Sequence, residues 1–315
     1  MSGRSIHVRR PGLHTTVQDL GRWGFQSQGV PIAGPMDPFS HRFANALVGN
    51  DRNVATLEIT LVGPELEFEG DCLVACAGAN FSVTVDGAEA PRSQAFRVPS
   101  HARLHFGPRS RGARAYLAVA GGIDTPLVLG SRATHVPSAM GGWAGRPLQK
   151  DDRLPVGVAA KRPTARPRPT GHAHDMLLDP AVLRVLPGPD ADRFDRTAAD
   201  VLQSEPYTVS GDSDRMGFRL RGPLLTLTKG ADIISDVTPT GTLQVPGTGQ
   251  PILLMADRQT TGGYPRIATV ISADLGIAGQ QGPGDMLSFR MCSPADAVSA
   301  LIARENALLA LEAGW

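Results

Sequence analysis

The densest group of side chains with chemical potential lies at residues 257–265, where the chain reads DRQTTGGYP. An apolar run (252–256) precedes it and a β-branched run (267–272) follows, so the segment joins two predicted strands. Ordinary hairpin connections need only about two to five residues. This one offers carboxylate, guanidinium, amide and hydroxyl groups in succession, and Gly262 and Gly263 let a ligand approach the backbone. The pattern predicts a binding loop. The alternative is an elaborate turn whose polar side chains satisfy its own backbone.

Two further polar segments precede this loop. Residues 210–219 read SGDSDRMGFR, which places Asp212 and Asp214 beside Arg215. An arginine fork can hold a carboxylate, carbamate or phosphate, but the acids could equally neutralise it in a capped turn. Residues 241–251 read GTLQVPGTGQP, where the amides of Gln244 and Gln250 can each donate and accept. Together these groups suit an amide, ureido or carboxylate ligand.

Two more candidate regions lie in the first half. Residues 15–37 (TTVQDLGRWGFQSQGVPIAGPMD) show little apolar continuity, which predicts a long structured loop ahead of a helix. Gln18, Asp19 and Arg22 would then line a cleft. Alternatively, an Asp19–Arg22 pair pins the loop to its own lobe. Residues 116–143 contain several glycine-rich turns that could form a second loop wall or ordinary hairpins.

Several classes of site are absent from the sequence. Lysine occurs at positions 150, 161 and 229 alone, and none belongs to a Gly-Lys-Ser/Thr triplet, which excludes a P-loop. None lies between two methionines, so the chain does not carry biotin. No histidine or cysteine spacing suggests zinc, and no Gly-x-Ser-x-Gly elbow occurs. We therefore expect no metal. Of the three cysteines, Cys72, Cys76 and Cys292, none belongs to a Cys-x-x-Cys pair, and Cys72 and Cys76 share a β-type run in which buried free thiols are expected.

Composition limits the class of protein. The chain has 315 residues, 41% of them hydrophobic, with 36 glycines and 26 prolines. That favours many short strands joined by tight turns, with enough apolar material for two lobes. A net charge of +1 lacks the excess of positive charge that is typical of proteins that bind nucleic acid or an anionic membrane. No run of eighteen apolar residues and no apolar leader occurs, so we expect a cytoplasmic protein.

The predicted fold is mainly β with a few helices. We expect an N-terminal β lobe over residues 1–158, a proline-rich linker over 159–178, and a C-terminal β lobe with a final helix over 179–315. Helices are predicted at 37–48, capped by Asp37, at 190–203, and at 294–313, where Ser293 and Asp296 form an approximate capping box. Apolar residues of the last helix form a stripe expected to pack on the core or on a partner: Val298, Leu301, Ile302, Leu308 and Leu309. Strands are predicted near 54–61, 65–69, 72–77, 81–85, 94–98, 102–106, 114–119, 181–186, 207–210, 217–220, 224–228, 242–245, 252–256 and 267–272.

The two halves share weak motifs in the same order. GPELEF at 63–68 resembles GPLLTL at 222–227, and FRVP at 96–99 resembles LQVP at 243–246. Together these matches suggest duplicated β lobes. The first half has no counterpart of DRQTTGGYP, since its corresponding region reads GPRSRGARAYLAVAGG. An elaboration confined to one lobe is typical of a functional site.

Long motifs of the chain also resemble a known family. TTVQDLGRWGFQSQGVPIAGPMD, SDRMGFRL, LQVPGTGQPILLMADRQTTGGYPRIATVISADL and PGDMLSF are similar to the allophanate hydrolase subunit 2 family, also called the biotin-dependent carboxyltransferase family. The resemblance covers about residues 6–290. The family includes the C component of bacterial 5-oxoprolinase, the antagonist of the sporulation-kinase inhibitor and the carboxyltransferase half of urea carboxylase. The resemblance implies two cyclophilin-like β-barrel lobes.

The resemblance also implies a function and partners. The leading expectation is a subunit of an ATP-dependent 5-oxoprolinase, which opens 5-oxoproline to glutamate. It would work with a subunit 1 family protein, similar to the B component of 5-oxoprolinase, and with a third chain similar to the A component. ATP would be held by the complex. The alternatives are a carboxyltransferase half that moves a carboxyl group from biotin to urea or a related amide, and a non-catalytic antagonist of a kinase inhibitor.

Roles for individual residues are hypotheses at this stage. Arg215 and Arg22 would bind an anionic group. Asp257 or Asp214 would act as base or polariser, and Tyr264 would form a hydrogen-bonding wall. The amide or ureido edge of the substrate would be held by Gln244, Gln259 and Thr260, with Gln18 lining the cleft.

Overall fold

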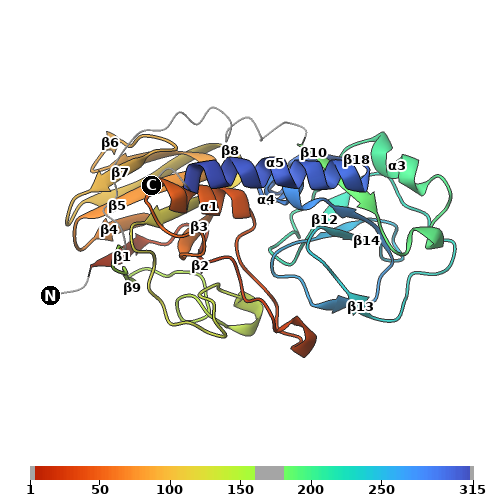
Figure 1. The fold of residues 1–315 in the computed structure, drawn as a ribbon, viewed down its shortest axis with the longest axis horizontal. Helices are drawn as coiled ribbons and strands as arrows, with labels where there is room; N and C mark the ends of the chain where they lie inside the picture. The colour runs from red at the N-terminus through yellow and green to blue at the C-terminus, as the bar shows by residue number, and fades with distance from the viewer. Residues whose placement is uncertain (1–3, 160–180, 313–315) are drawn as a thin grey trace. The chain divides into compact units, whose positions relative to one another are not determined.

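The computed structural model describes residues 4–159 and 181–312 (Figure 1). The chain forms two compact units, which we describe separately. Among the described residues, unit 1 contains 4–22, 33–159 and 306–312, and unit 2 contains 23–32 and 181–305. Apart from residue 159, the expected linker at 159–178 lies outside the described residues.

Unit 1 is built on a nine-stranded sheet. Its hydrogen-bonded path runs β2-β3-β8-β4-β1-β9, and β5 pairs with β6, β7 and β8. Apolar residues at alternate positions fill its core; Ile6 and Val8 of β1, for example, are fully buried. The strands are β1 (Ser5–Arg10), β2 (His14–Gln18), β3 (Thr56–Thr60), β4 (Glu65–Phe68), β5 (Cys72–Val85), β6 (Ala88–Glu89), β7 (Ala95–Val98), β8 (Arg103–Val119) and β9 (Arg153–Pro155).

Two long strands replace four predicted ones. The segments expected at 72–77 and 81–85 join in β5, and those at 102–106 and 114–119 join in β8. Register shifts between Gly78 and Val83 interrupt the alternation of side chains while the two strands stay paired. Such bulges break the apolar pattern in sequence and bend the strand in space.

Helix α1 (Pro38–Leu47) begins as predicted. The Asp37 carboxylate accepts hydrogen bonds from the backbone N–H groups of Phe39 and Ser40, both at 3.1 Å, and proline occupies the first helical position. One face of the helix packs Phe43, Ala44 and Leu47 onto β5 and β8. The short helices in the described part of the chain are η1 (Gln26–Gln28), η2 (Val136–Ser138), η3 (Ala191–Arg193), η4 (Ser272–Asp274), α3 (Ala198–Ser204) and α4 (Leu275–Gly279).

Unit 2 is a closed barrel. Its strands follow one another in the order β10-β17-β14-β15-β12-β11-β18. Leu183, Phe218, Leu243 and Leu253 are almost completely buried in its interior. The barrel strands are β10 (Ala181–Pro187), β11 (Tyr207–Val209), β12 (Gly217–Arg221), β14 (Thr242–Gln244), β15 (Ile252–Leu254), β17 (Arg266–Val270) and β18 (Met286–Met291), and a separate ribbon pairs β13 (Asp236–Val237) with β16 (Thr261–Gly262).

Two local predictions for unit 2 were wrong. The helix expected at 190–203 is divided into η3 and α3, and residues 224–228 form no strand beyond an isolated bridge between Phe194 and Leu227. The general expectation of a mainly β chain with a few helices is confirmed. Among the described strands, those of unit 2 close into a ring, whereas the path from β2 to β9 in unit 1 stays open.

The C-terminal helix α5 (Pro294–Glu312) has the predicted cap. Ser293 Oγ accepts from the Asp296 N–H, and the Asp296 carboxylate accepts from the Ser293 N–H, both at 3.1 Å. The apolar stripe is not a core face, because Val298, Leu301, Ile302 and Leu309 are exposed and only Leu308 of the predicted set is buried.

Candidate functional site

The loop of residues 257–265 connects β15 to β17 at one end of the barrel. Both strands pair with β14, which places Gln244, the last residue of β14, beside the loop. Pairing of β12 with β15 continues past the strand ends, since Asp257 N–H donates to the carbonyl of Arg215 at 2.8 Å. The barrel thus brings three predicted segments, 210–219, 241–251 and 257–265, to one place.

Arg215 and Asp257 form a buried, two-pronged ion pair. Arg215 Nε lies 2.9 Å from Asp257 Oδ2, and Arg215 Nη2 lies 3.0 Å from Oδ1. The two side chains are 8% and 2% exposed. Both carboxylate oxygens therefore already accept from a guanidinium, and the pair fixes the start of the loop to the segment that leads into β12. Anion binding by Arg215 would have to compete with Asp257.

Asp214, the second candidate base, is exposed and caps a turn. Its Oδ1 accepts from the N–H groups of Met216 at 2.8 Å and Gly217 at 3.2 Å. No hydrogen bond within the described chain reaches its other carboxylate oxygen. The capped-turn interpretation therefore accounts for one oxygen only.

Thr238 anchors the middle of the loop. Its N–H donates to the carbonyl of Thr260 at 3.1 Å, and its hydroxyl donates to the carbonyl of Gln259 at 2.6 Å. The β13–β16 ribbon continues this pairing. These bonds engage the backbone alone, and the side chains of Gln259, Thr260 and Tyr264 make no hydrogen bond to any described residue. Gln259 and Tyr264 are exposed and Thr260 is half-buried.

The side chain of Gln244 lies directly beneath the loop. It is 1% exposed, and its Nε2 donates to the carbonyl of Tyr264 at 3.3 Å. A Cβ atom at Gly262 would lie only 2.6 Å from that nitrogen. Glycine at this position therefore leaves room for the Gln244 amide, and the expected approach of a ligand to the backbone of Gly262 and Gly263 stays a prediction.

Arg258 was not among the residues that we selected from the sequence. It is 9% exposed, and its Nε donates to the carbonyl of Thr238 at 2.6 Å. Burial lowers the pKa of its guanidinium to about 10. Its position in DRQTT was visible in the sequence; the lack of a carboxylate partner was not.

Gln18 and Arg22 belong to unit 1. Gln18 ends β2, so the long loop predicted from residue 15 in fact starts as a strand. Both side chains are fully buried. Gln18 Nε2 donates to the Thr134 carbonyl at 3.1 Å, and Arg22 donates to the carbonyls of Val128 and Ala133 at 2.9 and 2.8 Å. These bonds tie residues 128–134 to residues 18–22 within unit 1, whereas residues 23–32 of the predicted loop belong to unit 2. The expected Asp19–Arg22 pair stays a prediction.

Unit 1 also contains a buried polar network that sequence reasoning missed. The Tyr116 hydroxyl donates to Glu58 Oε2 at 2.7 Å and accepts from the Asp37 N–H at 2.7 Å. Beside it, His41 Nδ1 lies 2.9 Å from Thr56 Oγ1, and the His41 and Tyr116 rings meet edge to face. Burial lowers the pKa of His41 to about 4, so the ring is neutral at physiological pH.

The buried His41 predicts a specific loss of stability in acid. The pKa of histidine in the unfolded chain is about 6.5, so protons favour unfolding as the pH falls from 6.5 to 4. We expect about 3 kcal/mol of unfolding free energy to be lost over this window and fully present above it. Urea unfolding at a series of pH values measures the effect. A His41→Gln variant should lack this part of the pH dependence, even if it is less stable at pH 7.5, and an unchanged profile in the variant would contradict the assignment.

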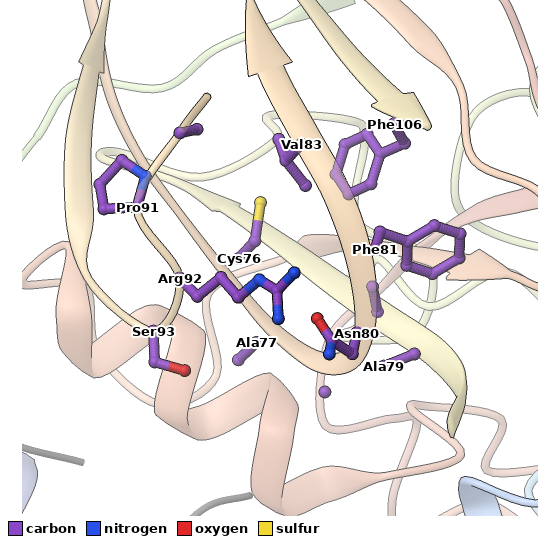
Figure 2. Close-up of a pocket in the computed structure, with 13 residues that line it drawn as sticks. Cys76, Ala77, Ala79, Asn80, Phe81, Val83, Pro91, Arg92, Ser93 and Phe106 are labelled. Atoms are coloured by element: carbon purple, nitrogen blue, oxygen red, sulfur yellow. The ribbon is translucent and has the colours of Figure 1, made fainter. Parts of the chain in front are cut away.

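Figure 2 shows the residues around a small cavity in unit 1, with Cys76 and Val83 from β5 and Phe106 from β8. Its volume is about 30 Å³, which holds on the order of one or two waters and no substrate. Burial raises the pKa of the Cys76 thiol to about 12, so the thiol is unreactive. In the described part of the chain no group of three or more His, Cys, Asp or Glu residues could hold a metal ion, and no helix is long and apolar enough to span a membrane.

Comparison of the chain with known proteins identifies its family. The family described as carboxyltransferase domain, subdomain A and B, matches residues 28–291. The chain belongs to this family. The match to the carboxyltransferase family includes the whole loop of residues 257–265, and it excludes β1, β2 and α5.

Members and relatives of the family differ in how much of their length this chain covers. It is 41% identical to the C component of 5-oxoprolinase from Escherichia coli over 94% of both chains. It is 32% identical to urea amidolyase of Saccharomyces cerevisiae over 90% of this chain but 16% of that protein. The crystal structure of the Kluyveromyces lactis urea carboxylase superposes with a TM-score of 0.89 and 31% identity, covering 98% of this chain and 29% of that one. The expected resemblance is confirmed.

Proposed function

We propose that this chain is one subunit of a cytoplasmic, ATP-dependent 5-oxoprolinase that opens 5-oxoproline to glutamate. The observation that carries the proposal is the match to the C component of the E. coli 5-oxoprolinase, which extends over 94% of both chains at 41% identity. Because the two chains match over 94% of their lengths, we infer that this chain is a separate subunit, as the C component is. We therefore also propose a subunit 1 partner, similar to the B component, and a third subunit similar to the A component, with ATP held by the complex.

The site of this subunit is proposed to be the loop of residues 257–265 with the groups beneath it. The substrate is a cyclic amide that carries a carboxylate, so it needs donors and acceptors for the ring amide. Gln259, Thr260 and Tyr264 are suited to this role, because no described residue engages their side chains. Gln244 would support the loop from below through its bond to the Tyr264 carbonyl.

The two acidic candidates, Asp257 and Asp214, are proposed to have different roles. Asp257 would hold the loop through Arg215, since that pair occupies both of its oxygens. Asp214, with one oxygen outside the turn, would be the candidate base. Gln18 and Arg22 are proposed to stabilise unit 1, because backbone carbonyls accept from both side chains.

Reconstitution of the complex tests the proposal. The chain would be co-expressed with its subunit 1 partner and the third subunit, and ATP hydrolysis would be measured with and without 5-oxoproline. We expect hydrolysis to depend on 5-oxoproline. A well-assembled complex without such turnover would overturn the proposal.

A carboxyltransferase half is the second candidate. It is favoured by the superposition of 98% of this chain on the K. lactis urea carboxylase structure. In that case a biotin carrier would deliver the carboxyl group to urea or a related amide. Incubation of the complex with carboxybiotin and urea would move the carboxyl group to a urea nitrogen, which gives up a proton, and carboxylated urea would form only if this alternative is correct.

A further inference from the structure

Unit 2 contains three buried arginines, and one of them lacks a carboxylate partner among the described residues. Arg215 pairs with Asp257, and Arg266 pairs with Asp190 at 2.7 Å and Asp236 at 2.9 Å. Arg258 is as deeply buried as these two, at 9% exposed, yet no described acidic side chain lies within ion-pair distance of it. Desolvation is the only cause that shifts its pKa, which agrees with the absence of a nearby carboxylate.

Contacts around Arg258 hold its head group in place. Its Nε donates to the Thr238 carbonyl at 2.6 Å, and Thr238 in turn binds the carbonyls of Gln259 and Thr260. The Arg258 guanidinium is thus fixed to the same backbone that presents the proposed substrate-binding side chains. Its two terminal nitrogens, Nη1 and Nη2, make no hydrogen bond to any described residue.

A fixed, buried guanidinium without a counter-ion is costly to a folded protein. The terminal nitrogens of Arg258 keep some contact with solvent, so the charge loses part of its hydration, and no partner among the described residues replaces that part. At a pKa of about 10 the group stays protonated near pH 7, so the charge persists. An anion that reached Nη1 and Nη2 would restore the missing interaction through two parallel, charge-assisted hydrogen bonds.

We propose that Arg258 binds the carboxylate of the substrate at the loop of residues 257–265. The inference rests on the proposed function and deepens it, since it requires a cyclic amide that carries a carboxylate. Urea has no charge and gains nothing from such a group. Arg258 would therefore distinguish the two candidate substrates, and it would orient the ring amide toward Gln259 and Thr260.

The proposal is tested on the reconstituted complex with Arg258→Met. Loss of two charge-assisted hydrogen bonds should raise KM for 5-oxoproline on the order of 100-fold. Arg258→Lys should recover part of this loss, because it keeps the charge but not the fork. The matched control is Arg219→Met, which changes an exposed arginine of the same barrel and should leave KM unaltered. An unchanged KM in Arg258→Met would overturn the proposal while the proposed function stands.

Two further measurements separate this proposal from a structural role and from the proposed function. Arg258→Met should unfold at nearly the same urea concentration as the unmodified chain, because removal of an uncompensated charge offsets the loss of the hydrogen bond to the Thr238 carbonyl; a large decrease would indicate a further structural partner and contradict the proposal. Binding to the complex without ATP would be measured for 5-oxoproline, 2-pyrrolidinone and inorganic phosphate. Binding of 5-oxoproline that needs both its carboxylate and Arg258 supports the site even if no turnover follows. Equal binding of 2-pyrrolidinone, or preference for phosphate, would contradict a substrate-carboxylate site.

Discussion

Replacement of Asp257 by asparagine is expected to lower the unfolding free energy of this chain by about 3–5 kcal/mol. Asparagine has nearly the same shape but no charge, so Arg215, 8% exposed, would keep its buried charge and lose the Asp257 carboxylate. Domains of ordinary size are stable by only about 5–15 kcal/mol, so the loss is a large fraction of the total. Urea unfolding of the purified chain measures it.

The control for this prediction is an exposed ion pair in the same unit. Asp212 lies 3.8 Å from Arg221, and both side chains are 74% exposed. Asp212→Asn should cost less than about 1 kcal/mol. If Asp257→Asn unfolds at the same urea concentration as Asp212→Asn, the Arg215–Asp257 pair does not hold the loop.

A double variant separates the structural role of Asp257 from a catalytic one. Replacing both partners with apolar residues, as in Asp257→Leu with Arg215→Met, removes both charges and should recover most of the lost stability. Turnover of the complex by this variant would remove Asp257 from the candidate bases. A folded and assembled but inactive double variant would retain it among them.

The second large effect is expected at Tyr116 of unit 1, where phenylalanine should cost about 2–4 kcal/mol. The hydroxyl is fully buried, accepts from the Asp37 N–H and donates to the Glu58 carboxylate. Burial raises the pKa of Tyr116 well above its ordinary value, so the group remains a donor. Its removal leaves a buried N–H without an acceptor at the start of α1 and takes a donor from a buried carboxylate.

Tyr207 provides a matched comparison for Tyr116. It is also fully buried, but its hydroxyl makes one hydrogen bond, to the Pro223 carbonyl at 3.1 Å. Tyr207→Phe should cost about 1 kcal/mol. Urea unfolding measures the unfolding free energy lost in each of the two variants. Equal losses would show that the network around Glu58 contributes nothing beyond an ordinary hydrogen bond.

Features determined by neighbouring residues could be predicted from the sequence. The cap formed by Asp37 with Pro38, and the reciprocal bonds of Ser293 and Asp296, connect residues at most three positions apart. The loop of residues 257–265 between two strands was also visible, because its run of polar residues interrupts two apolar runs. These signals are contained within a short window, so propensity and turn chemistry are sufficient.

Features determined by distant residues could not be predicted. The strand HTTVQ reads as polar, yet residues 15–18 are buried because segments more than a hundred positions away supply their partners, such as the Thr134 carbonyl for Gln18. Asp257 meets a guanidinium 42 positions away. Once that pair is formed, Arg258 is left without a counter-ion among the described residues, so its candidate role follows only from the folded barrel.

The most direct test of the proposed function is a subunit-omission experiment. Purified subunit 1 partner and third subunit would be incubated with ATP and 5-oxoproline, and glutamate would be measured before and after addition of this chain. We predict that glutamate appears only when this chain is present, in proportion to the ATP consumed. Equal glutamate formation without this chain, or none when the three-chain complex is fully assembled, would contradict the proposal that it is a required part of a 5-oxoprolinase.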